Sequence, residues 1–315
     1  MATIIGAVDH ADDTHALSKT LKRLTHSDDQ IVILGIAPRL SGSLTDHKVV
    51  SSAKRAEQAM LDGLTKKTET LCQELGRSID IDLVSGPPAQ KIIEAAILRK
   101  ADLLIKEDDD LSPDETARRA KVSRTLLQRA PCATLILRNP IQKPAPSVVI
   151  AVDKTEDKLD STARSLLNER VLSSGIEMAK RLGANEVMLL HAWTTADIKF
   201  LQHPLAGLSE STINYQIEGA RGEAVKWFAA FRDEVARKFD SSGLTFKTKL
   251  VFGEGGKAIA AAAEQIRPDL LVIGSANRRG AQSLFFGNTA QGVLDEALFN
   301  LLVIKPADFY ELVAS

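Results

Sequence analysis

The sequence predicts an α/β protein built from two tandem doubly wound domains, each with a five-stranded parallel sheet. Three observations lead to this fold class. The chain has 315 residues, more than one hydrophobic core usually supports. Short apolar runs rich in β-branched residues alternate with stretches of helical periodicity, as in βαβ units. The same order of elements then occurs a second time, which predicts two domains of one type.

The two halves of the chain repeat each other in sequence. The stretch TIIGAVD at residues 3–9 returns as SVVIAVD at 147–153, and QIVILGIA at 30–37 returns as EVMLLHAW at 186–193. Further along, residues 167 positions apart correspond, among them Gly86 with Gly253, Asp102 with Asp269 and Leu135 with Leu302. We therefore predict domains at 1–140 and 145–310, joined by a proline-rich linker, NPIQKPAP.

The elements of the second half follow from its pattern of apolar residues. Continuous apolar runs of strand length predict strands buried on both faces of a parallel sheet, at 147–153, 186–193, 245–253, 269–275 and 300–306. A stripe that runs from Ile217 through Phe228 to Phe239 at steps of three or four predicts a long helix. A second helix begins after Gly255–Gly256 and ends at Arg267-Pro268. The first half repeats this scheme, with Pro87–Pro88 at the start of the corresponding helix.

The composition excludes several classes of protein. With 44% apolar residues, 26% charged residues and a formal net charge of −1, the chain is an ordinary globular protein rather than a nucleic-acid binder. The N-terminus lacks a basic region and its apolar run is short, so we expect a cytoplasmic protein. Cys72 and Cys132 have neither CxxC nor Cys/His spacing, so we expect no metal site.

The candidate ligand site lies where the strands of the second half end. In an open parallel sheet, ligands bind at the carboxyl ends of the strands, where the first and fourth strands are neighbours. The first strand ends at Asp153, whose carboxylate can accept hydrogen bonds from an exocyclic amine or a ribose hydroxyl. The fourth ends at Ile273–Gly274 and opens into a loop with Gly280 and Gly287. Glycines let a backbone approach phosphates, and the N–H groups of a helix N-terminus bind them.

These residues resemble the universal stress protein family. Its ATP-binding members carry G-x2-G-x9-G-[S/T] after the fourth strand, and this chain matches the first and third motif glycines at Gly274 and Gly287 and has a loop glycine at Gly280. Asn277 stands at the second motif glycine, and Asn288 replaces the Ser or Thr. The resemblance implies a strand order of 3-2-1-4-5 and one site for ATP or AMP in the second half. The residues expected at that site are Asp153, Ile273, Gly274, Asn277, Arg278, Gly280, Gly287, Asn288 and Thr289.

The first half carries different residues at the corresponding positions. Glu107 replaces the first glycine and begins the run EDDD, where a triphosphate would meet like charge. We therefore expect no nucleotide in this half. The acidic run suits either a divalent cation or a solvated loop, and Asp9 is either a remnant of a lost site or a local cap.

Several residues have a structural explanation beside a functional one. The glycines after the fourth strand also suit a turn and close helix packing. Arg278–Arg279 suit phosphate contacts or a solvated loop. His191 lies in an apolar strand, as a hydrogen-bonded core histidine does, and Trp227 with its neighbouring phenylalanines suits the core or its edge.

The function predicted from these features is non-enzymatic. The chain lacks SGGxDS, HxGH, GxSxG and GxxxxGK[ST], so no catalytic residue is assigned. The resemblance implies a stress-response protein that acts by binding or scaffolding, and the alternative is an ATP-controlled switch with slow ATPase activity. The last strands, 134–138 and 300–305, would be exposed edges, so we expect them to pair within the chain as a pseudo-dimer or between copies as a homo-oligomer. No nucleic acid or membrane partner is expected.

Overall fold

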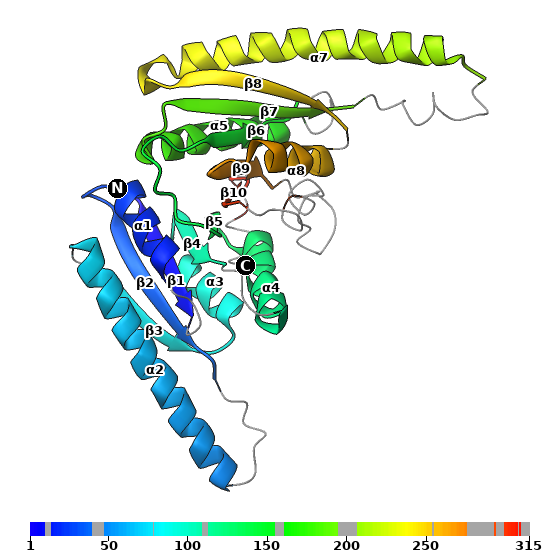
Figure 1. The fold of residues 1–315 in the computed structure, drawn as a ribbon. Helices are drawn as coiled ribbons and strands as arrows, with labels where there is room; N and C mark the ends of the chain where they lie inside the picture. Colours follow the sequence, from blue (N-terminus) through cyan, green and yellow to red (C-terminus); the bar gives the residue numbers. More distant parts are fainter. Residues whose placement is uncertain are drawn as a thin grey trace. The chain divides into compact units, whose positions relative to one another are not determined.

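The computed structural model describes most of the chain (Figure 1). The described residues are 1–9, 14–39, 47–77, 79–108, 113–154, 161–194, 207–253, 255–275, 293, 299–307 and 309. The chain divides into two compact units. The first comprises Met1–Lys143 with Ser275–Phe286 and Leu298–Ser315, and the second comprises Pro144–Gly274 with Gly287–Ala297.

The first unit is a parallel sheet with helices on both faces. Its strands are β1 (Thr3–Asp9), β2 (Gln30–Ala37), β3 (Asp80–Ser85), β4 (Leu103–Glu107) and β5 (Ala133–Leu137). They lie in the order β3-β2-β1-β4-β5, which confirms the predicted fold class and strand order. The central strands are buried almost throughout, because helices cover both of their faces.

The helices of the first unit form two layers. Ile92 of α3 (Pro88–Leu98) and Leu126 of α4 (Pro113–Arg129) belong to one buried cluster with Ile5 and Val32 on one face of the sheet. The other face meets α1 (His15–Leu24) and α2 (His47–Leu75), since a Cβ on Gly6 would lie 3.4 Å from Leu17 of α1.

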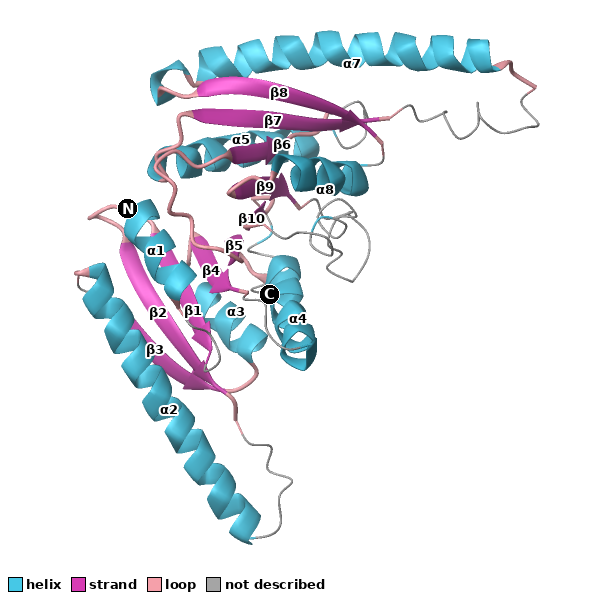
Figure 2. Cartoon of the chain, in the orientation of Figure 1, coloured by secondary structure: helices cyan, strands magenta, loops and turns pink. Residues whose placement is uncertain are grey.

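The second unit repeats this arrangement (Figure 2). Its strands are β6 (Val148–Ala151), β7 (Glu186–Trp193), β8 (Thr245–Phe252) and β9 (Leu270–Gly274), in the order β9-β6-β7-β8. Helices α5 (Ser161–Arg181) and α7 (Glu210–Lys238), the short η2 (Asp240–Ser242) and α8 (Gly255–Ile266) complete it. In the part of the chain that the structure describes, no helix has both the length and the apolar character needed to cross a membrane.

The last strand of the chain lies in the first unit. β10 (Leu301–Ile304) pairs antiparallel with β5, so that Leu302 lies opposite Leu135. Asn300 strengthens the pairing, because its Oδ1 accepts the backbone N–H of Arg138 at 2.7 Å and that of Asn139 at 3.1 Å. β5 and β10, which the sequence predicted to be exposed edge strands, therefore cover each other.

The repeat is visible in the backbone as well as in the sequence. Gly86 and Gly253 both have positive φ angles, of 148° and 139°, and each donates its N–H to the end of the second strand of its unit. Lys100 and Arg267, also 167 positions apart, both adopt the left-handed conformation, with φ of 48° and 49°. The same register thus holds where the backbone is most constrained.

Lys305, directly after β10, is a buried cation of the first unit. Its side chain is 2% exposed, its Nζ donates to the carbonyl oxygen of Leu127, and the Nζ lies 4.5 Å from the ring centroid of Phe309. Burial lowers the pKa of Lys305 from 10.5 to about 7, because the ammonium loses its hydration, while Cys132 acts in the opposite direction. Burial raises the pKa of the Cys132 thiol to about 12.

We predict that Lys305 makes the stability of the protein depend on pH. Between pH 7 and the lysine's ordinary pKa of 10.5, the unfolded chain keeps a proton that the folded chain releases. The free energy of unfolding therefore rises with pH, by up to about 1.4 kcal/mol per pH unit. Below pH 7 Lys305 is protonated in both the folded and the unfolded state, so it no longer contributes to the slope. Above pH 9, the ordinary pKa of the thiol, Cys132 loses its proton in the unfolded chain but keeps it in the folded chain, and this lowers the free energy of unfolding as pH rises.

Urea unfolding at a series of pH values measures this slope. Lys305→Met, which keeps an apolar side chain in the same space, should abolish the slope between pH 7 and 9. Lys121→Met, which removes an exposed lysine from α4, should leave it unchanged. An unaltered slope in Lys305→Met would contradict the assignment.

Candidate functional site

Two strand ends meet at the centre of the second unit. β6 and β9 are parallel neighbours in a register that places Ile150 opposite Val272. Because parallel strands advance together, the following residues bring Asp153 and Gly274 to the same edge of the sheet. The structure thus joins two of the residues that the sequence assigned to one site.

Gly274 also has a packing role. A Cβ at this position would lie 3.0 Å from Val171 Cγ2 and 3.2 Å from side-chain atoms of Leu167, both on α5. The close approach of α5 to β9 therefore favours glycine here, which agrees with the interpretation of this glycine as a packing residue. The neighbouring Ile273 is 1% exposed, so its side chain belongs to the core and only its backbone faces the strand end.

The remaining predicted site residues lie outside the described part of the chain. These are Asn277, Arg278, Gly280, Gly287, Asn288 and Thr289. Their contribution to a site stays a prediction.

Asp153 is held in place through its backbone. Its N–H donates to Asn168 Oδ1 at 3.0 Å, and the amide of Asn168 donates back to the carbonyl oxygen of Asp153. This pair of hydrogen bonds fixes the strand end against α5 and leaves the carboxylate exposed. An exposed carboxylate on a fixed backbone is suited to bind a ligand.

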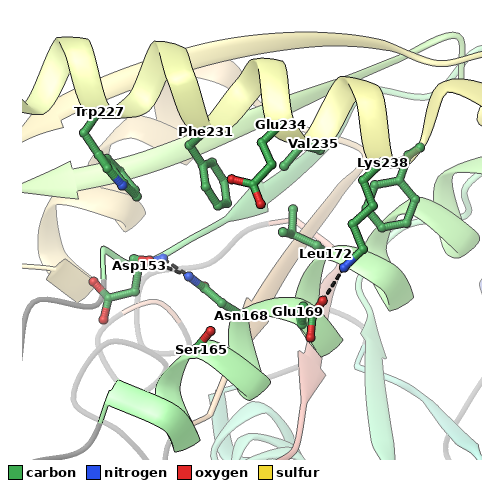
Figure 3. Close-up of a pocket in the computed structure, with 11 residues that line it drawn as sticks. Asp153, Ser165, Asn168, Glu169, Leu172, Trp227, Phe231, Glu234, Val235 and Lys238 are labelled. Atoms are coloured by element: carbon green, nitrogen blue, oxygen red, sulfur yellow. Dashed lines mark hydrogen bonds and ion pairs between the residues drawn. The ribbon is translucent and has the colours of Figure 1, made fainter. Parts of the chain in front are cut away.

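A pocket of about 300 Å³ begins at Asp153 and runs between α5 and α7. Figure 3 shows Trp227 and Phe231 pointing from α7 into this space, with Ser165 and Asn168 below them on α5. Leu172, Val235 and Phe239 add apolar surface. The pocket has an aromatic wall on one helix and a mainly polar wall on the other.

The charged side chains of the pocket are unevenly distributed. At one end, Lys238 of α7 forms an ion pair with Glu169 of α5. Glu234 projects from α7 beside Phe231, and no described residue forms a hydrogen bond or an ion pair with its carboxylate (Figure 3). Sequence reasoning assigned none of these charged residues to a site, since the only available signal was the spacing of Trp227 and Phe231.

His191 is a structural residue in this arrangement. It is 4% exposed, its Nδ1 lies 3.0 Å from the carbonyl oxygen of Val152, and its ring meets Trp227 edge-on at 4.8 Å. This agrees with the interpretation of a hydrogen-bonded core histidine. It also supports the aromatic wall from below, because Trp227 rests on it.

The corresponding strand ends of the first unit are filled by protein side chains. Glu107 is 1% exposed, and its carboxylate accepts the backbone N–H groups of Ala16 at 3.1 Å and Leu17 at 3.2 Å. It therefore caps the first turn of α1, where the helix dipole favours negative charge. Asp108 faces Arg138 at 3.5 Å, and Asp9 is 1% exposed.

The described residues contain no cluster of potential metal ligands. No group of three or more His, Cys, Asp or Glu side chains among them could hold a metal ion. Of the acidic run EDDD, only Glu107 and Asp108 lie in the described part. Both cysteines, Cys72 and Cys132, are free thiols.

Comparison with known proteins supports the resemblance seen in the motif residues. A family model described as the universal stress protein family matches residues 1–138 and again 148–305. Universal stress protein E of Escherichia coli K12 is 26% identical over 236 residues, covering 74% of this chain and 70% of that protein. Its counterpart in Salmonella typhi is 25% identical over 240 residues, covering 75% and 71%.

Solved structures share the fold. The crystal structure of a universal stress protein from Archaeoglobus fulgidus superposes with a TM-score of 0.57 at 15% identity and covers 96% of this chain and 98% of that one. A structure from Pseudomonas aeruginosa gives 0.66 at 20% identity and covers 100% and 98%. These matches span both units, as a tandem arrangement requires.

We predict that the Glu107 cap contributes measurably to stability. Glu107→Gln keeps the size of the side chain but removes its charge and turns one oxygen acceptor into a donor facing backbone N–H groups. The free energy of unfolding should fall by about 1–3 kcal/mol, as for other buried charged hydrogen bonds. Urea unfolding measures it.

A matched control for this variant lies on α2. Glu69→Gln neutralises an exposed glutamate and should change the stability by less than about 0.5 kcal/mol. Equal effects of the two substitutions would show that Glu107 is not a cap.

Proposed function

Since the chain belongs to the universal stress protein family, we propose that it acts by binding, with one adenine nucleotide, ATP or AMP, in the second half of the chain. The nucleotide lies at the carboxyl ends of β6 and β9. The observation that carries this proposal is the meeting of Asp153 with Gly274 at adjacent strand ends.

The chemistry of these strand ends suits a nucleotide. The exposed carboxylate of Asp153 accepts hydrogen bonds from an adenine amine or a ribose hydroxyl. The chain leaves β9 at Gly274 and enters the glycine-containing loop, where Gly280 and Gly287 allow the backbone to approach phosphate oxygens. Arg278 adds positive charge to the same loop.

The proposal assigns one site per chain rather than two. In the first unit, Glu107 already occupies the space beside the first turn of α1 with a buried carboxylate. An anionic ligand would have to displace this carboxylate from its N–H donors, and it would meet Asp108 nearby. The first unit is then structural, and the pairing of β5 with β10 lies within it.

The action proposed is non-enzymatic, as a stress-response binding or scaffold protein in the cytoplasm. One observation favours the alternative of an ATP-controlled switch with slow ATPase activity. The segment with Gly280 and Gly287 precedes β10 in the sequence, and β10 pairs with β5. A nucleotide bound to this segment would bias that pairing, or a pairing between copies, if it prefers one of two states.

Calorimetric titration with ATP and with AMP tests the nucleotide site. We expect one site per chain, and we expect protein purified without added nucleotide to release AMP or ATP on denaturation. Asp153→Asn should weaken binding at least tenfold, since it removes the charged acceptor. Gly287→Val should abolish binding by blocking the loop. Asp9→Asn, the matched change in the first unit, should leave binding unchanged.

Two results would contradict this proposal. Two equivalent sites per chain would show that the first unit binds as well. Unaltered affinity in Asp153→Asn, with the thermal stability of the variant preserved, would place any nucleotide elsewhere.

A further inference from the structure

The pocket between α5 and α7, called the groove from here on, has the composition of a ligand site separate from the proposed nucleotide site. Three aromatic rings line it: Trp227 and Phe231 of α7 (Figure 3), and Phe239, which directly follows α7. Its volume of about 300 Å³ suits a small organic molecule. Every residue that lines it belongs to the second unit.

The charge of the groove selects the class of ligand. Its lining contains three carboxylates, those of Asp153, Glu169 and Glu234, and one cation, Lys238, while the ammonium of Lys154 lies over the ring of Trp227. The ion pair between Lys238 and Glu169 neutralises one end. Two carboxylates remain along the aromatic wall, Asp153 and Glu234, against the one cation Lys154, so the excess negative charge disfavours phosphate or carboxylate groups.

The aromatic wall itself attracts cations. The Nζ of Lys154 lies 5.9 Å from the ring centroid of Trp227, within the range of a cation–π interaction. Trp227 also packs against Phe231, with ring centroids 5.3 Å apart, so the two rings offer one continuous surface. A ligand cation placed over this surface would also come under the field of Glu234 and Asp153.

We propose that this groove binds an organic cation, in which a quaternary or tertiary ammonium group is attached to an apolar or aromatic body. The ammonium lies between the rings of Trp227 and Phe231 and the carboxylate of Glu234. The apolar body lies against Leu172 and Val235 of the groove. This site does not depend on the nucleotide proposal, because it is built from described residues of α5 and α7.

The two tryptophans of the chain provide a direct measurement. In ¹⁵N-labelled Trp193→Phe protein, the remaining indole N–H resonance belongs to Trp227, which lines the groove. Titration with phenyltrimethylammonium should shift this resonance saturably. N,N-dimethylaniline, at a pH where it is uncharged, should bind about tenfold more weakly, because it lacks the cationic charge. The anion phenylphosphonate should leave the resonance in place.

Two variants of the same helix separate the groove from general surface charge. Glu234→Gln should weaken binding of phenyltrimethylammonium about threefold to tenfold. Glu223→Gln removes an equal charge from an exposed position of α7 outside the groove lining and should leave binding unchanged. Added salt should weaken binding to the parent protein more than to Glu234→Gln.

The proposal fails on any of three outcomes. If N,N-dimethylaniline bound as tightly as phenyltrimethylammonium, the groove would be an apolar cavity without preference for a cation. If phenyltrimethylammonium caused no saturable shift of the Trp227 resonance, the groove would not be a cation site. Equal losses in Glu234→Gln and Glu223→Gln would trace the binding to the overall charge of α7. The comparison between probes uses a single protein, so it stands even if a variant folds poorly.

Discussion

Helix α5 packs closely on strands β6 and β9 at two glycines. A Cβ on Gly175 would lie 2.6 Å from Ile150, and a Cβ on Gly274 would lie 3.0 Å from Val171, so either side chain would force its neighbours to shift. The same helix carries Asn168, which holds the backbone of Asp153, and Leu172, which lines the groove. This close packing of α5 on the sheet therefore positions both the residue that holds the strand-end backbone and one wall of the groove.

The two repeats use this position in opposite ways. At the corresponding position of the first unit, the carboxylate of Glu107 accepts two backbone N–H groups of α1. The first unit thus satisfies a helix N-terminus with its own charge, which stabilises the fold and fills the strand end. The second unit has Gly274 there and an exposed carboxylate at Asp153. At equivalent positions of one backbone register, Glu107 therefore fills the strand end of the first unit, while Gly274 leaves no side chain at the strand end of the second.

Local sequence patterns predicted the fold, whereas the Glu107 cap and the groove depend on contacts between residues far apart in the sequence. Strand runs, the position of Gly86 and Gly253, and the register of the repeat depend on residues close in sequence, and these predictions agree with the structure. The cap on α1 joins residues about 90 positions apart, so Glu107 appeared in the sequence only as an unfavourable charge. The groove was not predicted because its walls come from two helices, α5 and α7, that lie far apart in the sequence.

Asp153 stands at the edge of both proposed sites, and this position links them. A cation held by Glu234 leaves the Asp153 carboxylate available to adenine or ribose, since Glu234 lies farther along α7 beside Phe231 (Figure 3). The cation would then favour the phosphates of a nucleotide bound at the neighbouring strand end. Because coupling between two ligands is reciprocal, the nucleotide would raise the affinity of the groove for the cation by the same factor. A cation that instead engaged Asp153 would compete with the base, so the sign of the coupling reports which carboxylate holds it.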